Sequence, residues 1–175
     1  MNALSEAIRV ALADFASDLR SVAWYGRENE LVNWFAHGHL MRVVADSGTS
    51  LDPMQIGIEV AVPQIAEPTA RHRRDVRKDL VIWRRPKQTC WIGPRQHGEP
   101  PLAILEWKSM NNVGVPESEP KKRREFAADV NWLRAATRRS PDLLGYAVFV
   151  DLRPTTPKVE YQGVIDGKAA PVILI

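Results

Sequence analysis

The sequence contains a single cysteine, Cys90, among 175 residues. One cysteine excludes an internal disulfide and a thiolate metal cluster, and fits an intracellular, cytoplasmic protein best. No run of about 18 apolar residues is present, so no membrane span is expected. The first twenty residues also lack the apolar run of a signal peptide, because Glu6, Arg9, Asp14 and Asp18 interrupt them. The four histidines show no spacing typical of a zinc site.

The composition is that of an ordinary globular protein, with 45% hydrophobic and 26% charged residues. A chain of this length suggests one domain over residues 1–175, large enough to bury a core without disulfides. Within it we expect an N-terminal helix in residues 1–26, a core in residues 27–152 and a C-terminal strand extension in residues 153–175.

The charge is distributed unevenly along the chain. The net charge is +3 overall, but it is −5 over residues 1–70, +9 over residues 71–139 and −1 over residues 140–175. A basic segment between acidic flanks predicts a surface for a polyanion, and DNA is the expected partner. The alternative is a solvated face of arginines. The candidate contacts adjoin the acidic motifs described below and are Arg73, Arg74, Arg77, Lys78, Arg84, Arg85, Lys121, Lys122, Arg123 and Arg124.

Hydrophobic periodicity predicts an α/β fold. Apolar residues at helical spacing predict helices over about 3–20, 27–44 and 121–139, whereas alternation over 56–62 predicts a strand. Further strands are expected at 80–83, 102–108 and 145–152, with two short ones near 159–165 and 172–175. The order ααβββαβ, with extra C-terminal strands, predicts a mixed β-sheet flanked by helices.

Three acid-x-lysine triplets occur, and only one lies in a strand context. The triplets at 119–121 and 166–168 contain a proline and a turn glycine, whereas Glu106-Trp107-Lys108 ends an apolar run. Residues i and i+2 of a strand point to the same face, so we expect Glu106 and Lys108 to project together and Trp107 to point into packing.

Asp79 supplies a second carboxylate. If strands 78–84 and 102–108 are neighbours, Asp79 reaches Glu106, and two adjacent carboxylates repel unless a cation lies between them. Mg²⁺ or Mn²⁺ accepts such oxygen ligands, so Asp79, Glu106 and the carbonyl of Trp107 are the expected metal ligands. A metal-bound water can attack a phosphodiester, and Lys108 would orient that water or stabilise the transition state.

The runs 78–83 and 102–108 resemble the PD-(D/E)XK, or restriction-endonuclease-like, nuclease superfamily. The resemblance covers about residues 27–152 and implies a restriction-endonuclease-like core with a metal-dependent nuclease activity that hydrolyses DNA or RNA. It implies that Asp79 and Glu106 bind metal and that Lys108 activates water. The sequence departs from the family pattern in having Lys78 before Asp79 instead of proline, and in the long gap between Asp79 and Glu106.

Members of that superfamily often take a further glutamate from an upstream helix. Glu28 and Glu30 both lie early in the second predicted helix, and either could point at the sheet edge. The helix dipole also favours acids in a first turn, which leaves the choice open. Glu59, on the strand 56–62, is a second-tier candidate that alternation also allows to face solvent.

Two other functions are compatible with the same residues. The chain could be a catalytically inactive nuclease-like module that binds nucleic acid or another protein through the basic segment. It could also be a subunit whose apolar tail, residues 170–175, docks on a partner, although an edge strand explains that tail equally well. The sequence is also compatible with a homodimer.

Overall fold

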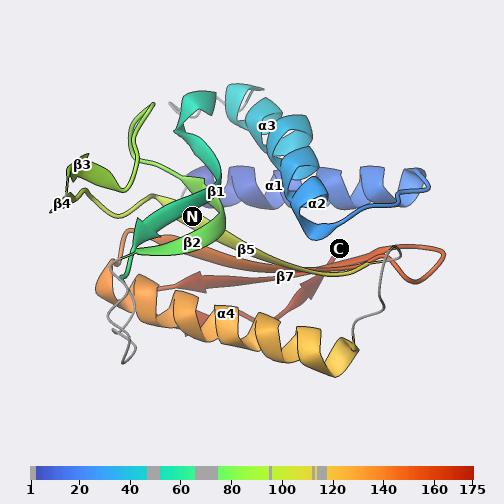
Figure 1. The fold of residues 1–175 in the computed structure, drawn as a ribbon. Helices are drawn as coiled ribbons and strands as arrows, with labels where there is room; N and C mark the ends of the chain where they lie inside the picture. The colour runs from blue at the N-terminus through green and yellow to red at the C-terminus, as the bar shows by residue number, and fades with distance from the viewer. Residues whose placement is uncertain (1–2, 47–51, 66–74, 95, 112, 114–117) are drawn as a thin grey trace.

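A mixed β-sheet lies between two layers of helices in the computed structural model, which describes residues 3–46, 52–65, 75–94, 96–111, 113 and 118–175. The sheet order is β1-β2-β5-β6-β7-β8, with β9 also paired to β7. Helices α1, α2 and α3 cover one face and α4 covers the other (Figure 1). The predicted α/β class and the mixed sheet flanked by helices are therefore confirmed.

The helices lie close to where the sequence predicted them. They are α1 (Ala3–Ser21), α2 (Glu28–Trp34), the π-helix η1 (Phe35–Leu40), α3 (Met41–Asp46), the 3₁₀ turn η2 (Pro53–Gln55) and α4 (Glu119–Arg139). The single helix expected over about 27–44 is thus a helical run whose central turn is a π-helix. Apolar periodicity cannot detect this change, because it reports only which side of a helix is buried.

The strands confirm the predicted order and add two features. They are β1 (Ile56–Pro63), β2 (Asp75–Ile82), β3 (Trp91–Gly93), β4 (Gln96–His97), β5 (Ala103–Met110), β6 (Leu144–Asp151), β7 (Lys158–Ile165), β8 (Lys168–Ala169) and β9 (Ile173–Leu174). The β3–β4 pair lies between the strands predicted at 80–83 and 102–108, where no strand was predicted, and β8 was not predicted either. Both are very short, and pairing with a neighbouring segment decides whether such residues form strands.

Strand pairing brings the two predicted motifs side by side. β2 is antiparallel to both β1 and β5, whereas β5 and β6 are parallel and are joined through α4. The neighbouring position of β2 and β5, on which the prediction of a shared site depends, is confirmed. Asp79 lies inside β2 and not at its start, because the strand begins at Asp75.

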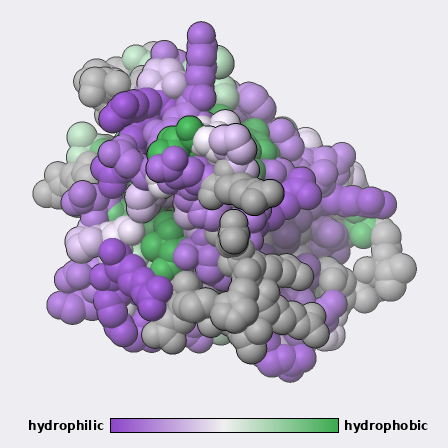
Figure 2. Space-filling view, turned by 60° about the vertical axis from the view of Figure 1, so that its left-hand side comes forward, coloured by the Kyte–Doolittle hydropathy of each residue, from purple (hydrophilic) through white to green (hydrophobic). Residues whose placement is uncertain are grey.

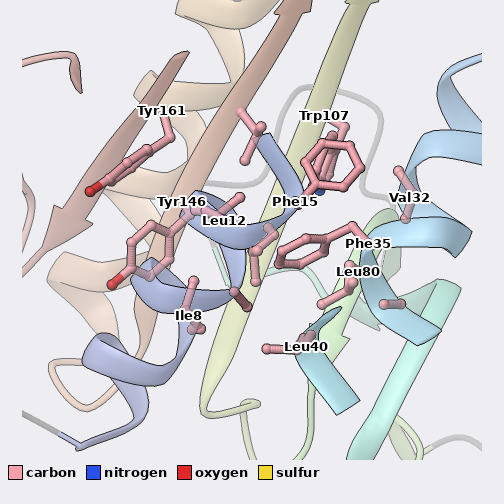
Figure 3. Packing of buried hydrophobic residues seen from close by; sticks show 14 of the residues in the cluster. Ile8, Leu12, Phe15, Val32, Phe35, Leu40, Leu80, Trp107, Tyr146 and Tyr161 are labelled. Carbon is pink, nitrogen blue, oxygen red and sulfur yellow. The ribbon is translucent and has the colours of Figure 1, made fainter. Parts of the chain in front are cut away.

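The two faces of the sheet carry separate hydrophobic cores. On the face covered by α1, Trp107 is fully buried and its ring lies 5.5 Å from that of Phe15 and 5.2 Å from that of Phe35 (Figure 3). On the other face, Ile104 packs in the cluster under α4 that includes Phe126. Alternation along β5 therefore turns Trp107 away from Glu106 and Lys108 and into packing, as predicted, and the structure places Trp107 on the α1 side and the two charged residues on the α4 side.

The surface is largely hydrophilic on the side shown in Figure 2, where apolar patches are small and scattered. In the part of the chain that the structure describes, no helix is long and apolar enough to cross a membrane.

Candidate active site

The candidate site lies where β2 and β5 separate. The two strands pair from Leu80 opposite Leu105 to Ile82 opposite Ala103, and this pairing ends next to Asp79 and Glu106. The Asp79 carboxylate then accepts a hydrogen bond of 2.7 Å from the backbone N–H of Trp107. This bond satisfies a strand donor after the ladder has ended, and it holds the Asp79 side chain beside β5.

Two lysine–carboxylate ion pairs lie beside this contact, on the face of the sheet that α4 covers. The Lys78 ammonium binds the Glu106 carboxylate, and both side chains are buried. The Lys108 ammonium lies 2.9 Å from Asp129 on α4 and donates a 2.7 Å hydrogen bond to the carbonyl of Trp107. Each charged group of the Glu106-Trp107-Lys108 triplet therefore has a counter-ion within the chain.

Glu28 is the upstream acid that the structure brings to this place. Its carboxylate accepts a 2.7 Å hydrogen bond from the backbone N–H of Ser109 and lies 4.0 Å from the Lys122 ammonium. Glu30 instead turns back and accepts a 2.6 Å hydrogen bond from the N–H of Arg27, which caps α2. Of the two glutamates between which the sequence left the choice open, the structure brings Glu28 to the cluster, whereas the carboxylate of Glu30 is used by its own helix.

Asp129 is a site residue that the sequence analysis missed. It lies on α4 between Phe126 and Leu133, which both pack against the sheet, and its side chain is 21% exposed. An acid on the inward side of an amphipathic helix is a usable sequence signal, because a buried carboxylate needs a partner.

Burial sets the direction of the pKa shift for the three acids Glu106, Glu28 and Asp129. It raises the pKa of Glu106 to about 7, because desolvation and the charge of Asp79 together outweigh the opposing effect of Lys78. Burial likewise raises the pKa values of Glu28 and Asp129, although Lys108 opposes both shifts. Burial alone would lower the pKa of Lys108, but the charges of Asp129, Glu28 and Asp79 outweigh it and the net pKa is raised.

The donor types suit Mg²⁺, but their partners in this structure are protein groups. Asp79, Glu106 and the Trp107 carbonyl offer oxygen ligands, and the two carboxylates are close enough that the charge of Asp79 adds to the effect of burial in raising the pKa of Glu106. One carboxylate oxygen of Glu106, one of Asp79 and the Trp107 carbonyl are each bonded within the chain. Among the described residues, no group of three or more acids, histidines or cysteines is already arranged around a metal position.

The predicted nucleic-acid contacts Arg77 and Lys78, which are neighbours on β2, differ in exposure. Arg73 and Arg74 lie outside the described residues. Lys78 is buried against Glu106, so its assignment as a surface contact was wrong. The exposed Arg77 pairs at 2.6 Å with Glu59, and this contact at the outer strand β1 removes Glu59 from the site.

Arg84 and Arg85 follow β2. Arg84 is half-buried and donates a 2.9 Å hydrogen bond to the carbonyl of Pro100, which gives it a structural partner. Arg85 is exposed and lies 3.9 Å from Glu99. Of these two side chains, Arg85 is the one whose cation is open to solvent.

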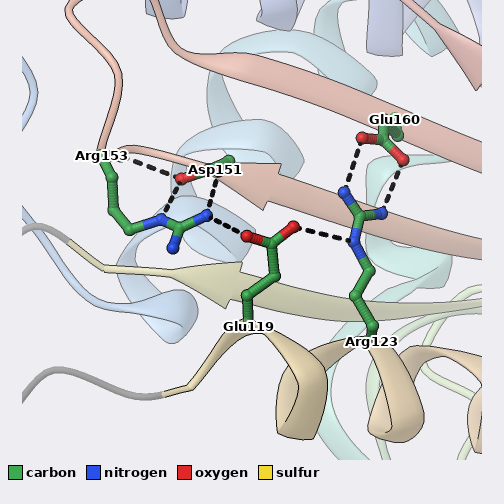
Figure 4. Close-up of polar contacts among 5 residues, drawn as sticks. All are labelled: Glu119, Arg123, Asp151, Arg153 and Glu160. Carbon is green, nitrogen blue, oxygen red and sulfur yellow. Dashed lines mark hydrogen bonds and ion pairs between the residues drawn. The ribbon is translucent and has the colours of Figure 1, made fainter.

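The basic start of α4 is partly neutralised. Arg123 forms two hydrogen bonds of 2.7 and 2.9 Å with Glu160 (Figure 4). Its guanidinium also lies 3.9 Å from the centre of the Phe149 ring. Lys122 is mostly buried beside Glu28, and Lys121 lies 3.8 Å from Glu125. Arg124 is exposed. The unfavourable interaction of these cations with the helix dipole is thus offset by ion pairs within α4 and to α2 and β7.

In comparisons with known proteins, no family model, curated protein or solved structure matches this chain.

Proposed function

We propose that this chain is a metal-dependent nuclease, a hydrolase of phosphodiester bonds in nucleic acid, with a restriction-endonuclease-like core. The observation that carries the proposal is the meeting of Asp79, Glu106 and Lys108 where β2 and β5 separate. The antiparallel β1–β2–β5 arrangement followed by the parallel β6 supports the same fold family. DNA is the proposed substrate, since the basic segment is next to the site.

Mg²⁺ or Mn²⁺ would be held by Asp79, Glu106 and the Trp107 carbonyl. When bound, such an ion acidifies a coordinated water and stabilises negative charge on a phosphate. Glu28 would support the site from α2, where it is already fixed to the backbone of β5.

Lys108 has a role that its own contacts define. Its ammonium is held by Asp129 and by the Trp107 carbonyl, beside the proposed metal ligands. A positioned cation there can orient the attacking water or stabilise the developing charge on the phosphate oxygens. Asp129 would then act through Lys108 as a positioning residue.

The direct test is a cleavage assay on single- and double-stranded DNA and RNA with Mg²⁺ or Mn²⁺. We expect metal-dependent cleavage by the wild type and its loss in Asp79→Ala and Lys108→Ala, with folding checked by circular dichroism. Asp166→Ala and Lys168→Ala provide matched controls, because they alter an acid-x-lysine triplet in the exposed β7–β8 turn. Absence of cleavage by the folded wild type on all four substrates would refute the proposal.

A second candidate function is a non-catalytic module that binds nucleic acid. It is favoured by one observation, the internal counter-ions that already engage Glu106 and Lys108. Such a module would bind nucleic acid with strong salt dependence and no metal dependence. Metal binding that is lost in Asp79→Ala would favour the nuclease instead.

A further inference from the structure

Lys78 is a buried cation whose place is defined on two sides. Its side chain is 7% exposed, and its ammonium lies between the Glu106 carboxylate and the ring of Trp132, 3.6 Å from the ring centre. Trp132 is itself held, because its indole N–H donates a 3.2 Å hydrogen bond to Gln64. A buried ammonium is costly without such partners, so the pocket is built for a positive charge.

The same carboxylate is a proposed metal ligand. Lys78 binds one oxygen of Glu106, and Asp79, the next residue of β2, supplies the other carboxylate of the metal site. An ammonium and a divalent cation repel each other, and at contact distance on one buried carboxylate this repulsion is weakly screened. Metal binding and the Lys78–Glu106 pair therefore compete.

We propose that Lys78 is an internal counter-ion for Glu106 that a divalent metal must displace, so that Lys78 sets the metal affinity of the site. This inference rests on the proposed nuclease function and concerns its regulation. Lys78 does not touch the reacting atoms in this reading, and is a positioning residue. It stabilises the buried Glu106 when metal is scarce and makes the site responsive to metal concentration.

The test is Mn²⁺ binding, measured by titration calorimetry and by the electron paramagnetic resonance signal of free Mn²⁺. Lys78→Met keeps an unbranched side chain and removes the charge. We expect it to bind Mn²⁺ about tenfold more tightly than the wild type, because an ammonium in contact with a carboxylate lowers the affinity of that carboxylate for another cation by at least that factor. Arg77→Met is the matched control, since it removes one positive charge from the neighbouring residue, whose side chain is 71% exposed. The Mn²⁺ affinity of this variant should match that of the wild type.

Equal or weaker Mn²⁺ binding by folded Lys78→Met would overturn the inference. If that variant does not fold, the rate of reductive methylation of Lys78 is measured in the wild type with and without Mn²⁺. The rate should rise when Mn²⁺ is added, and an unchanged rate in a protein that binds Mn²⁺ would overturn the inference.

The two proposals fail differently. Metal-dependent cleavage by the wild type, with no gain of affinity in Lys78→Met, removes the inference and leaves the nuclease standing. A wild type that neither binds Mn²⁺ nor cleaves nucleic acid removes the proposed function, and the role of Lys78 in metal binding with it.

Discussion

The buried Glu106 should make the stability of this protein depend on pH in a direction unusual for a carboxylate. Its pKa rises from its ordinary value of 4.5 to about 7 in the folded protein, chiefly through burial. The folded state then binds this proton more tightly than the unfolded state. The stabilisation is fully present below about pH 4.5 and is lost as the pH rises through about 7.

The size of the effect follows from the same pKa. A tenfold difference in proton affinity corresponds to about 1.4 kcal/mol, so this group alone should remove about 3 kcal/mol of folding free energy across that window. Glu106→Gln abolishes the titration. Loss of the ion pair to Lys78 should also change the free energy of unfolding of the variant at every pH. That loss does not restore the pH dependence that the substitution abolishes.

The assay is urea unfolding of wild type and Glu106→Gln at several pH values from 4.5 to 8.5. The free energy of unfolding of the wild type minus that of the variant should fall by about 3 kcal/mol over this range. Glu119→Gln is a control of opposite sign, because its hydrogen bond to Arg153 lowers the pKa of Glu119. A difference between wild type and Glu106→Gln that does not change with pH would refute the reasoning.

Two further predictions concern single contacts. Ser5 and Tyr146 share a buried hydrogen bond of 2.7 Å between α1 and β6, so Ser5→Ala and Tyr146→Phe should each cost about 1–3 kcal/mol, and the double variant less than their sum; additive losses in urea unfolding would contradict this. Arg124→Gln should weaken DNA binding and make the salt dependence of that binding shallower, with unchanged stability. Arg123→Met should instead lose about 1 kcal/mol of stability and keep its affinity for DNA, because Glu160 already binds the Arg123 guanidinium. Fluorescence anisotropy over a salt series and urea unfolding would measure both, and the reverse pattern would contradict the assignment.

Local sequence pattern was sufficient for the elements that carry the motifs. The alternation around Glu106 and Lys108 predicted that both leave the same face of β5 while Trp107 packs on the other, and the structure confirms this. The helical period predicted α1 in the same way. These features depend only on the geometry of one strand or one helix, so neighbouring residues encode them.

The tertiary structure decided which charged groups meet. Glu28 and Glu30 are two residues apart in the same helical turn, and only the packing of α2 against β5 assigns Glu28 to the cluster and leaves Glu30 as a cap. Asp129 joins because α4 crosses the face of β5 that carries Lys108.

The burial of Lys78 is a second feature that local sequence could not predict. In the sequence it belongs to a basic run, typical of a solvated surface, yet pairing of β2 with β5 and the ring of Trp132 enclose it beside Glu106. Periodicity states which way a side chain points from its own element. The free energy of a buried charge is set by partners that lie far away in the chain, and these are known only once the strands and helices have packed.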